Sequence, residues 1–187
     1  LDLGQSYYWR IDTVDASSNV TAGNVWTFEI SPNVSQAIDP SAFVATASSE
    51  YSSGRGATNA IDGSGLVNGA HGTDITTMWQ PGANQLPLWL KVDMNEAYYL
   101  EQAKIWNFNW AGYTERGAKD VEIYYSNSSS DPGNPVDNPA NWTHLKDVAV
   151  SEAPGVSSYD SPLEISMGMV QARWVSLKVT STHKTAT

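Results

Sequence analysis

The sequence of 187 residues contains no cysteine, which excludes a disulfide framework and a zinc site built on thiolates. It also lacks any run of about 18 apolar residues, so it predicts no membrane-spanning helix. Basic residues are few: 10 lysines and arginines stand against 20 aspartates and glutamates, which gives a net charge of -10. A surface this negative repels phosphate backbones and anionic lipid headgroups. We therefore expect no nucleic-acid partner and no membrane partner.

Sequence motifs of catalysis are missing as well. The chain has no Gly-x-Ser-x-Gly elbow, no His-Glu-x-x-His helix and no phosphate-binding glycine loop. The three histidines, His71, His144 and His183, lie far apart in the sequence and do not support a nucleophile triad. The carboxylates are scattered over loops and outer strand positions, and the sequence does not indicate a pair of them placed for glycoside hydrolysis. We expect this segment not to be an enzyme, although a catalytic domain elsewhere in the parent polypeptide would be a natural companion.

The residues that are abundant indicate an all-β protein. Serine, threonine, asparagine, glycine and aromatic residues are frequent, while charged residues make up only 16% of the chain, which is typical of an extracellular β domain. Residues 88–94 alternate cleanly between apolar and polar and predict a strand with one buried face. Further strands are predicted over residues 43–48, 103–108, 118–126, 142–150 and 172–180. Residues 127–141, with three prolines, predict a long surface loop. Short strands separated by such turns favour a sandwich or jelly roll.

The first 30 residues predict a separate β-hairpin. Residues 7–11 and 25–30 alternate around a polar turn region, and a two-stranded unit alone is marginal in water. The sequences Tyr-Tyr-Trp-Arg-Ile-Asp and Gly-Asn-Val-Trp-Thr-Phe resemble the last two strands of a fibronectin type III-like domain. The alternative is a hairpin that packs onto the main domain. Residues 31–40, with two prolines, are predicted to be a linker.

From residue 41 to the end, the order of short motifs is similar to that of the discoidin family, also called F5/8 type C. The matching segments are Ala47–Glu50, Asn59–Gly63, Thr77–Trp79, Leu88–Met94, Ile105–Asn109 and Arg116–Ser126. The carbohydrate-binding branch of this family is carbohydrate-binding module family 32. The resemblance implies a jelly-roll β-sandwich of the galactose-binding-domain type over residues 41–187, with ligand loops at one end. The usual final family strand, which begins Gly-Leu-Ser-Glu, is not found, so we expect the chain to be a fragment or this strand to have diverged.

The resemblance also implies a structural calcium ion. Asp62 would supply a carboxylate and Thr77 a hydroxyl or carbonyl oxygen, with Ala60 and Ser64 as carbonyl donors. Calcium prefers six to eight oxygen ligands, and these residue types provide oxygens only. One ligand in the family usually comes from the final strand. The alternative is an ordinary Asp-Gly turn capped by its own aspartate.

The family's ligand-binding end points to a second set of residues. Arg116 falls where the family places its sugar-binding arginine, and its fixed fork of donors suits two neighbouring hydroxyls. Aromatic rings stack on the apolar face of a pyranose, and Trp110 and Tyr113 lie on the same short loop. The complete predicted set of ligand-binding residues is Arg116, Trp110, Tyr113, His71, Tyr51 and Asn109.

Each of these positions also has a structural alternative. Arg116 could pair with Glu115 or Asp120 as a solvated charge, and His71 could simply be exposed on its glycine-rich loop. Trp110 could belong to the core. We place four tryptophans within or beside regular strand patterns in the core or at its edges: Trp79, Trp89, Trp106 and Trp174.

The sequence thus predicts a non-catalytic carbohydrate-binding module within an extracellular, multidomain, polysaccharide-processing protein. Its expected partner is a polysaccharide or oligosaccharide, its expected cofactor is a structural Ca²⁺ and its expected state is monomeric. The alternatives are a discoidin-type adhesion module that binds a protein or cell-surface partner, and a structural spacer.

Overall fold

The computed structural model describes residues 5–30, 36–82 and 86–184. The chain divides into two compact units, Leu1–Ile38 and Asp39–Thr187. The domain boundary therefore falls within the predicted linker, whose residues 31–35 lie outside the described residues.

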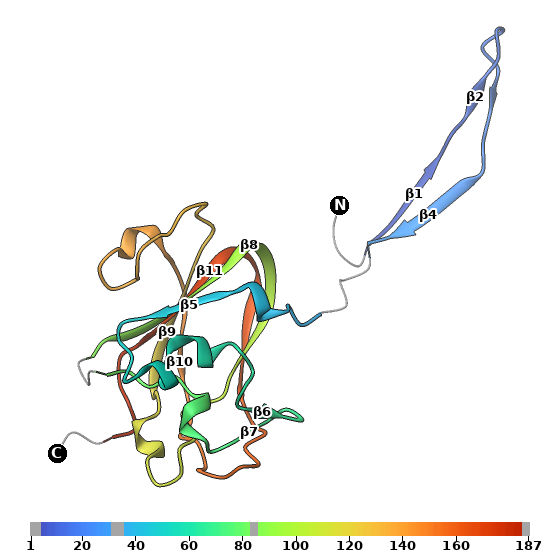
Figure 1. Ribbon diagram of the computed structural model, residues 1–187. Helices are drawn as coiled ribbons and strands as arrows, with labels where there is room; N and C mark the ends of the chain where they lie inside the picture. Colours follow the sequence, from blue (N-terminus) through green and yellow to red (C-terminus); the bar gives the residue numbers. More distant parts are fainter. Residues whose placement is uncertain (1–4, 31–35, 83–85, 185–187) are drawn as a thin grey trace. The chain divides into compact units, whose positions relative to one another are not determined.

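The second unit is built on one antiparallel sheet of five strands, in the spatial order β10-β9-β11-β8-β5 (Figure 1). The strands are β5 (Val44–Ala47), β8 (Leu88–Ile105), β9 (Asp120–Ser126), β10 (Thr143–Ala149) and β11 (Leu163–Val179). The described residues contain no α-helix, only six short 3₁₀ turns. The prediction of an all-β domain is confirmed.

Two strands, β8 and β11, are much longer than the others and pair in two stretches. Residues 88–93 pair with residues 174–179, and residues 98–105 pair with residues 163–172, with register shifts between and within these stretches. Gly168 and Met169 lie in the left-handed region, at φ values of 66° and 60°, where the second stretch is irregular. The predicted strand over residues 103–108 was wrong as a separate element, because residues 103–105 complete β8.

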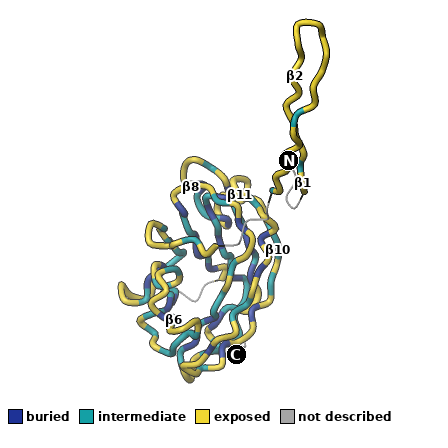
Figure 2. Tube along the Cα trace, turned by 90° about the vertical axis from the view of Figure 1, so that its right-hand side faces the viewer, coloured by how far each residue is buried: buried dark blue, intermediate teal, exposed yellow. Residues whose placement is uncertain are grey.

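The core follows the alternation that the sequence shows. Leu88, Leu90 and Met94 are buried on β8, and Val121 and Ile123 are buried on the neighbouring β9. Figure 2 shows the buried residues gathered along the strands of this unit, with exposed residues in the connecting loops. Because each buried leucine or isoleucine removes a large apolar side chain from water, these positions hold the strands together with about 1.5 to 3 kcal/mol each.

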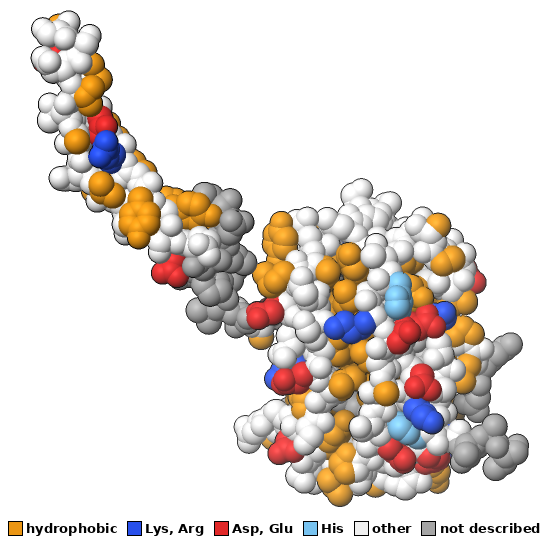
Figure 3. Space-filling model, turned by 180° about the vertical axis from the view of Figure 1, so that it is seen from behind, with side chains coloured by type: hydrophobic (Ala, Val, Ile, Leu, Met, Phe, Trp, Pro, Cys, Tyr) orange, Lys and Arg blue, Asp and Glu red, His pale blue; other side chains and the backbone are white. Residues whose placement is uncertain are grey.

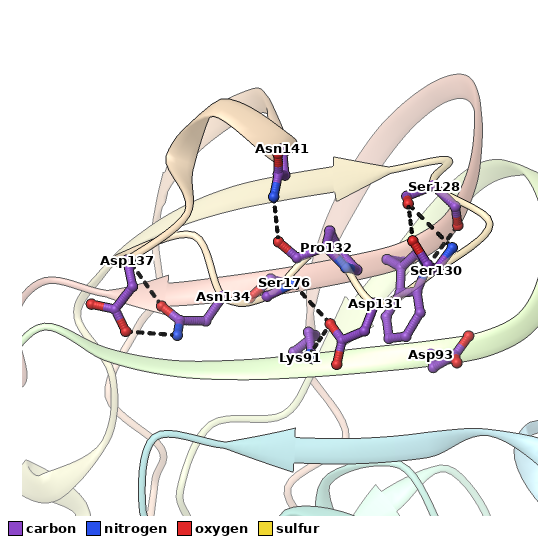
Figure 4. Close-up of polar contacts among 12 residues, drawn as sticks. Lys91, Asp93, Ser128, Ser130, Asp131, Pro132, Asn134, Asp137, Asn141 and Ser176 are labelled. Carbon is purple, nitrogen blue, oxygen red and sulfur yellow. Dashed lines mark hydrogen bonds and ion pairs between the residues drawn. The ribbon is translucent and has the colours of Figure 1, made fainter.

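Lys91 breaks the alternation, since its side chain is only 8% exposed. Its Nζ lies 2.6 Å from Asp131 Oδ1 and 5.2 Å from the ring centroid of Trp174. Asp131 belongs to the long loop of residues 127–141, and Figure 4 shows this loop passing over Lys91. Trp174 Nε1 donates a further hydrogen bond of 2.9 Å to the carbonyl oxygen of Ser128. These contacts hold the first half of the predicted surface loop against the sheet.

Short elements occupy the loops between the long strands. These are η1 (Pro40–Ala42), η2 (Ser53–Arg55), η3 (Ala57–Ala60), β6 (Leu66–Val67), β7 (Ala70–His71), η4 (Ile75–Thr77), η5 (Thr114–Arg116) and η6 (Pro139–Asn141). In Figure 1 the β6–β7 hairpin and the yellow η5 turn lie at the lower end of the sheet, and the orange loop with η6 lies at the upper end. None of the helical turns in the described part of the chain has the length and apolar character needed to cross a membrane.

The first unit is a hairpin of β1 (Ser6–Arg10) and β4 (Val25–Glu29), extended by the short pair β2 (Thr13–Val14) and β3 (Val20–Thr21). Directly opposed aromatic residues pair across the strands: Tyr7 stacks on Phe28 at 5.6 Å, and Trp9 lies against Trp26 at 4.5 Å between ring centroids. Figure 3 shows hydrophobic side chains along this hairpin, and both tryptophans are 48% exposed. Cross-strand aromatic pairs of this kind contribute about 0.2 to 1 kcal/mol each.

Candidate functional site

The site is assembled from loops that share one end of the five-stranded unit. The first of these follows β5 and is held by the segment around Trp79. Trp79 Nε1 donates to the carbonyl oxygen of Ser49 at 3.1 Å, and the Tyr51 N–H donates to the carbonyl oxygen of Gln80 at 2.8 Å. Gln80, which is buried, also accepts a hydrogen bond of 2.8 Å from Arg55 Nη1 at its side-chain oxygen. Both the backbone of this loop and the Arg55 guanidinium are therefore fixed before any ligand arrives.

The second loop, which follows β8, is held by Asn109. This side chain is completely buried, and its amide nitrogen donates to the carbonyl oxygens of His71, Gly72 and Val156 at 3.2, 2.9 and 2.8 Å. Its Oδ1 accepts a hydrogen bond of 2.8 Å from the Gly155 N–H. The predicted contact of Asn109 with a ligand is wrong, because a buried amide with all of its hydrogen-bonding groups engaged is not available to a sugar. Asn109 instead ties three loops together next to Trp110.

Five side chains from these two loops form a continuous stack, which we call the aromatic–guanidinium cluster: Tyr51, Arg55, Trp110, Tyr113 and Arg116. Trp110 and Tyr113 stack with their ring centroids 4.1 Å apart and their planes at 23°. Arg116 Cζ lies 4.4 Å from the Tyr113 centroid and 5.4 Å from that of Trp110. Arg55 Cζ lies 4.7 Å from the Tyr51 centroid and 5.6 Å from that of Trp110. Guanidinium groups over aromatic faces at such distances are attracted by the ring electrons and held in place.

The cluster is open to solvent at both ends. Tyr51 is 60% exposed and Tyr113 is 40% exposed, whereas Trp110 between them is half-buried. The only ion pair of Arg116 in the described residues is a long one, with 3.9 Å from its Nε to Glu115 Oε1. Such an exposed pair contributes little. No ion pair with Asp120 forms within the described residues, so the ring contacts and not a carboxylate orient Arg116.

His71 lies beside this assembly but makes no contact with its rings among the described interactions. Its Nδ1 is 2.8 Å from the carbonyl oxygen of Gly72, which can only accept, so Nδ1 carries the proton. The ring packs on Gly65, where a Cβ atom would lie 2.6 Å from His71 Nε2. The backbone of His71 is fixed by its hydrogen bonds with Tyr159 and Asn109. The predicted ligand-binding role of His71 stays a prediction.

The residues predicted for calcium lie on two segments that Asn59 joins. Asn59 Nδ2 donates to the carbonyl oxygens of Thr76 and Met78 at 2.9 and 3.1 Å, and to that of Gly54 at 3.2 Å. The Asp-Gly turn after η3 is thereby connected to η4, which carries Thr77. Sequence reasoning placed Asn59 in the family motif but did not recognise this bridging role.

The donor groups at this place match calcium in kind and are low in charge. Asp62 Oδ1 accepts a hydrogen bond of 2.8 Å from the Ser64 N–H, and Thr77 Oγ1 donates to the carbonyl oxygen of Asp74 at 2.7 Å. Hydrogen bonds from the backbone N–H and hydroxyl of Thr76 lower the pKa of the Asp74 carboxyl. The described residues hold no group of three or more histidine, aspartate and glutamate side chains suited to a metal. Asp62 and Thr77 thus make the local hydrogen bonds of their own turns, and a calcium ion at this place stays a prediction.

A second polar region lies on the sheet and shares no residue with the cluster. A hollow of about 310 Å³ is lined by residues of β9 and β10 together with Thr180: Asp120, Val121, Glu122, Asp147, Val148 and Ala149. Nearby, His144 Nε2 lies 2.7 Å from Asp147 Oδ1. This hollow is lined by carboxylates without an aromatic platform, so it lacks the groups that sugar recognition needs.

The model of the F5/8 type C domain family matches residues 44–187. The chain belongs to this family. A search of curated proteins finds no match to it.

Solved structures similar to this F5/8 type C domain include several bacterial carbohydrate-binding modules. The family 32 module of NanJ from C. perfringens, in complex with galactose, superposes with a TM-score of 0.54 at 19% identity, covering 78% of this chain and 87% of that one. Chitosan-binding module 1 of a chitosanase/glucanase from Paenibacillus sp. IK-5 gives 0.52 at 21% identity, covering 74% and 83%. Module 2 of the same enzyme, in complex with chitotriose, gives 0.51 at 17% identity, covering 74% and 84%. These likenesses confirm the predicted jelly-roll sandwich.

Of the six predicted ligand residues, the structure brings four into the cluster: Tyr51, Trp110, Tyr113 and Arg116. It places His71 beside them and buries Asn109. Sequence reasoning missed Arg55, which lies between Tyr51 and Trp110 in the cluster. The available signal was its position four residues after Tyr51, on a loop that the family resemblance already placed at the ligand end.

Proposed function

We propose that this F5/8 type C domain is a non-catalytic carbohydrate-binding module that binds a neutral glycan at the aromatic–guanidinium cluster. The observation that carries the proposal is the combination of exposed aromatic rings with two guanidinium groups on loops fixed by buried hydrogen bonds. Rings supply a flat apolar surface for the C–H face of a pyranose, and a guanidinium supplies donors for adjacent hydroxyls. Because the groups are already oriented, little conformational freedom is lost when a sugar binds.

The solved relatives support the choice of ligand class. One was determined with galactose and another with chitotriose, and both share the fold of this chain. The presence of Arg55 and Arg116 in one cluster disfavours a polycation such as chitosan, since like charges at close range repel. We therefore propose neutral, galactose-type glycans, and an extracellular polysaccharide-processing protein as the parent polypeptide.

The proposal is tested by calorimetric titration of neutral oligosaccharides into the chain and its variants. Arg116→Ala removes up to two hydrogen bonds to sugar hydroxyls, each contributing about 0.5 to 1.5 kcal/mol, so we expect affinity to fall about 10- to 100-fold. Lys119→Ala, which removes an exposed cation just beyond the site, is the matched control and should bind normally. Equal binding by Arg116→Ala and the unaltered chain would overturn the assignment, and a glycan array without hits would favour the adhesion alternative.

We also propose that the oxygens of Asp62, Thr77, Ala60 and Ser64 hold a structural Ca²⁺. The support is their oxygen-only chemistry and the Asn59 connection between the two segments. With so few carboxylates, we expect a dissociation constant of about 0.1 to 1 mM. At about 10 mM Ca²⁺ this would stabilise the fold by about 1.4 to 2.7 kcal/mol.

The calcium proposal is tested by melting curves in Ca²⁺ and in chelator, with Mg²⁺ as the ion control. We expect a rise in Tm of at least about 3 °C in Ca²⁺, and its loss in Asp62→Asn. Melting curves that coincide in Ca²⁺ and in chelator would rule out the ion.

A further inference from the structure

The aromatic–guanidinium cluster contains two equivalent halves. Tyr51 has the Arg55 guanidinium at 4.7 Å, and Tyr113 has the Arg116 guanidinium at 4.4 Å. Trp110 lies between the halves, 5.6 Å from Arg55 Cζ and 5.4 Å from Arg116 Cζ. Each half therefore has one exposed ring and one fork of donors, which is the minimum set for holding one pyranose.

The two halves are carried by different parts of the chain. Tyr51 and Arg55 lie on the loop after β5, and Tyr113 and Arg116 lie on the loop after β8. Each loop has its own anchor, Gln80 for the first and Asn109 for the second. Because the anchors are separate, one half can be altered without dismantling the other.

Arg55 has donors to spare. Its one side-chain hydrogen bond among the described interactions goes from Nη1 to the neutral side-chain oxygen of Gln80. No carboxylate forms an ion pair with Arg55 in the part of the chain that the structure describes. The carboxylate of Glu50, the nearest acid in the sequence, instead accepts the Ala57 N–H at 2.7 Å. A guanidinium has five N–H donors, so most of those on Arg55 remain for hydroxyl groups of a ligand.

We propose that Tyr51 and Arg55 form a second sugar subsite beside the one at Tyr113 and Arg116, with Trp110 as the shared wall between them. The ligand is then an oligosaccharide of at least two linked sugars and not a single terminal residue. This inference rests on the proposed function, and it makes Arg55 a residue that determines preference for ligand length.

The test is a length series measured by calorimetry. The probes are neutral β-1,4-linked galactose oligosaccharides and N-acetylated chito-oligosaccharides, each from one to four units. In the series that binds, we expect affinity to rise about tenfold from one unit to two and to change little beyond the length that fills both subsites. Arg55→Ala and Tyr51→Ala should remove the gain in affinity that the disaccharide has over the monosaccharide. Arg116→Ala should lower both affinities by the same factor of about 10 to 100.

Ser53→Ala, an exposed change on the same loop as Arg55, is the matched control and should leave the length dependence intact. Arg55→Lys keeps the charge but loses the fork, so it should also lose the gain from the second sugar. Because Arg55 also bonds to Gln80, replacing Arg55 changes the loop as well as the proposed subsite. A second measurement therefore uses the unaltered chain. In NMR titrations of the unaltered chain, a monosaccharide should shift the amide of Gly112, and a disaccharide should additionally shift those of Gly54 and Gly56.

The outcomes separate this inference from the function on which it rests. Binding that depends on Arg116 but is equal for one and two sugars would overturn the second subsite and leave the carbohydrate-binding function intact. Monosaccharide affinity that falls equally in Arg55→Ala and Arg116→Ala would also overturn it, because a single sugar would then bridge both arginines. An absence of binding in both series would overturn the function and the subsite together.

Discussion

Replacing Asn109 by alanine tests whether this buried amide holds the ligand end of the domain together. The substitution leaves the Gly155 N–H and the carbonyl oxygens of Gly72 and Val156 without their partner. An unsatisfied buried group costs about 1 to 3 kcal/mol, but Val156 is 47% exposed, so water can replace part of the lost bonding. We therefore expect a loss of about 2 to 4 kcal/mol in the free energy of unfolding. With a urea dependence of about 2 kcal/mol per molar, the unfolding midpoint should fall by about 1 to 2 M.

The midpoint is followed by tryptophan fluorescence in urea, with unaltered chain measured in parallel. Asn127→Ala is the control, because the Asn127 side chain is exposed and makes one long hydrogen bond of 3.3 Å to Gln171. Its midpoint should stay within the equivalent of about 0.5 kcal/mol. If Asn109→Ala and Asn127→Ala shift the midpoint equally, the positioning role of Asn109 is refuted.

Three further expectations concern the charged groups of the sheet. Lys91→Met should change the unfolding free energy by less than about 1 kcal/mol, whereas Asp131→Ala, which leaves the buried ammonium unpaired, should cost about 3 kcal/mol in urea unfolding. A hydrogen bond from Arg173 lowers the pKa of Asp93. The ionised Asp93 carboxylate therefore stabilises the fold above about pH 4, and this stabilisation is lost as the pH falls through the folded-state pKa. Arg173→Gln should flatten the fall of Tm below about pH 4. Burial, together with a hydrogen bond to a glutamate, raises the pKa of Tyr124 to about 12. The neutral Tyr124 side chain therefore stabilises the fold fully below about pH 10, and this stabilisation is lost between pH 10 and 12. In an ultraviolet alkaline titration, Tyr124→Phe should remove one tyrosine that ionises near pH 12.

Most of the strands could be predicted because their apolar residues alternate. Leu88, Leu90 and Met94 are buried on β8, and Val121 and Ile123 are buried on β9, so the main apolar positions of both patterns do lie in the core. The first half of β11 was missed because Gly168 and Met169 interrupt its alternation with an irregular, left-handed stretch. The burial of Lys91 was not predicted, since the sequence does not reveal that a loop some 40 residues later covers it.

The ligand end was predictable where one loop carries all the relevant residues. Trp110, Tyr113 and Arg116 lie within seven positions, so their proximity follows from the chain itself. Arg55 reaches Trp110 only through the tertiary hydrogen bonds of Gln80, which no local pattern records. Asn109 was misassigned because an asparagine next to a tryptophan looks the same in sequence whether its amide faces a ligand or three carbonyl groups.

The arrangement of β5 and β11 around β8 has a mechanical consequence. Val44 at the start of β5 and Trp174 within β11 both pair with Asp93, and both strands then run toward the start of β8. The chain thus enters the sheet through β5 at one end and leaves it from β11 at the other. Tension applied through these two connections pulls the strands lengthwise past one another, so the ladder must give way as a whole instead of opening one hydrogen bond at a time. Force spectroscopy on the intact chain should accordingly show this unit resisting extension in shear.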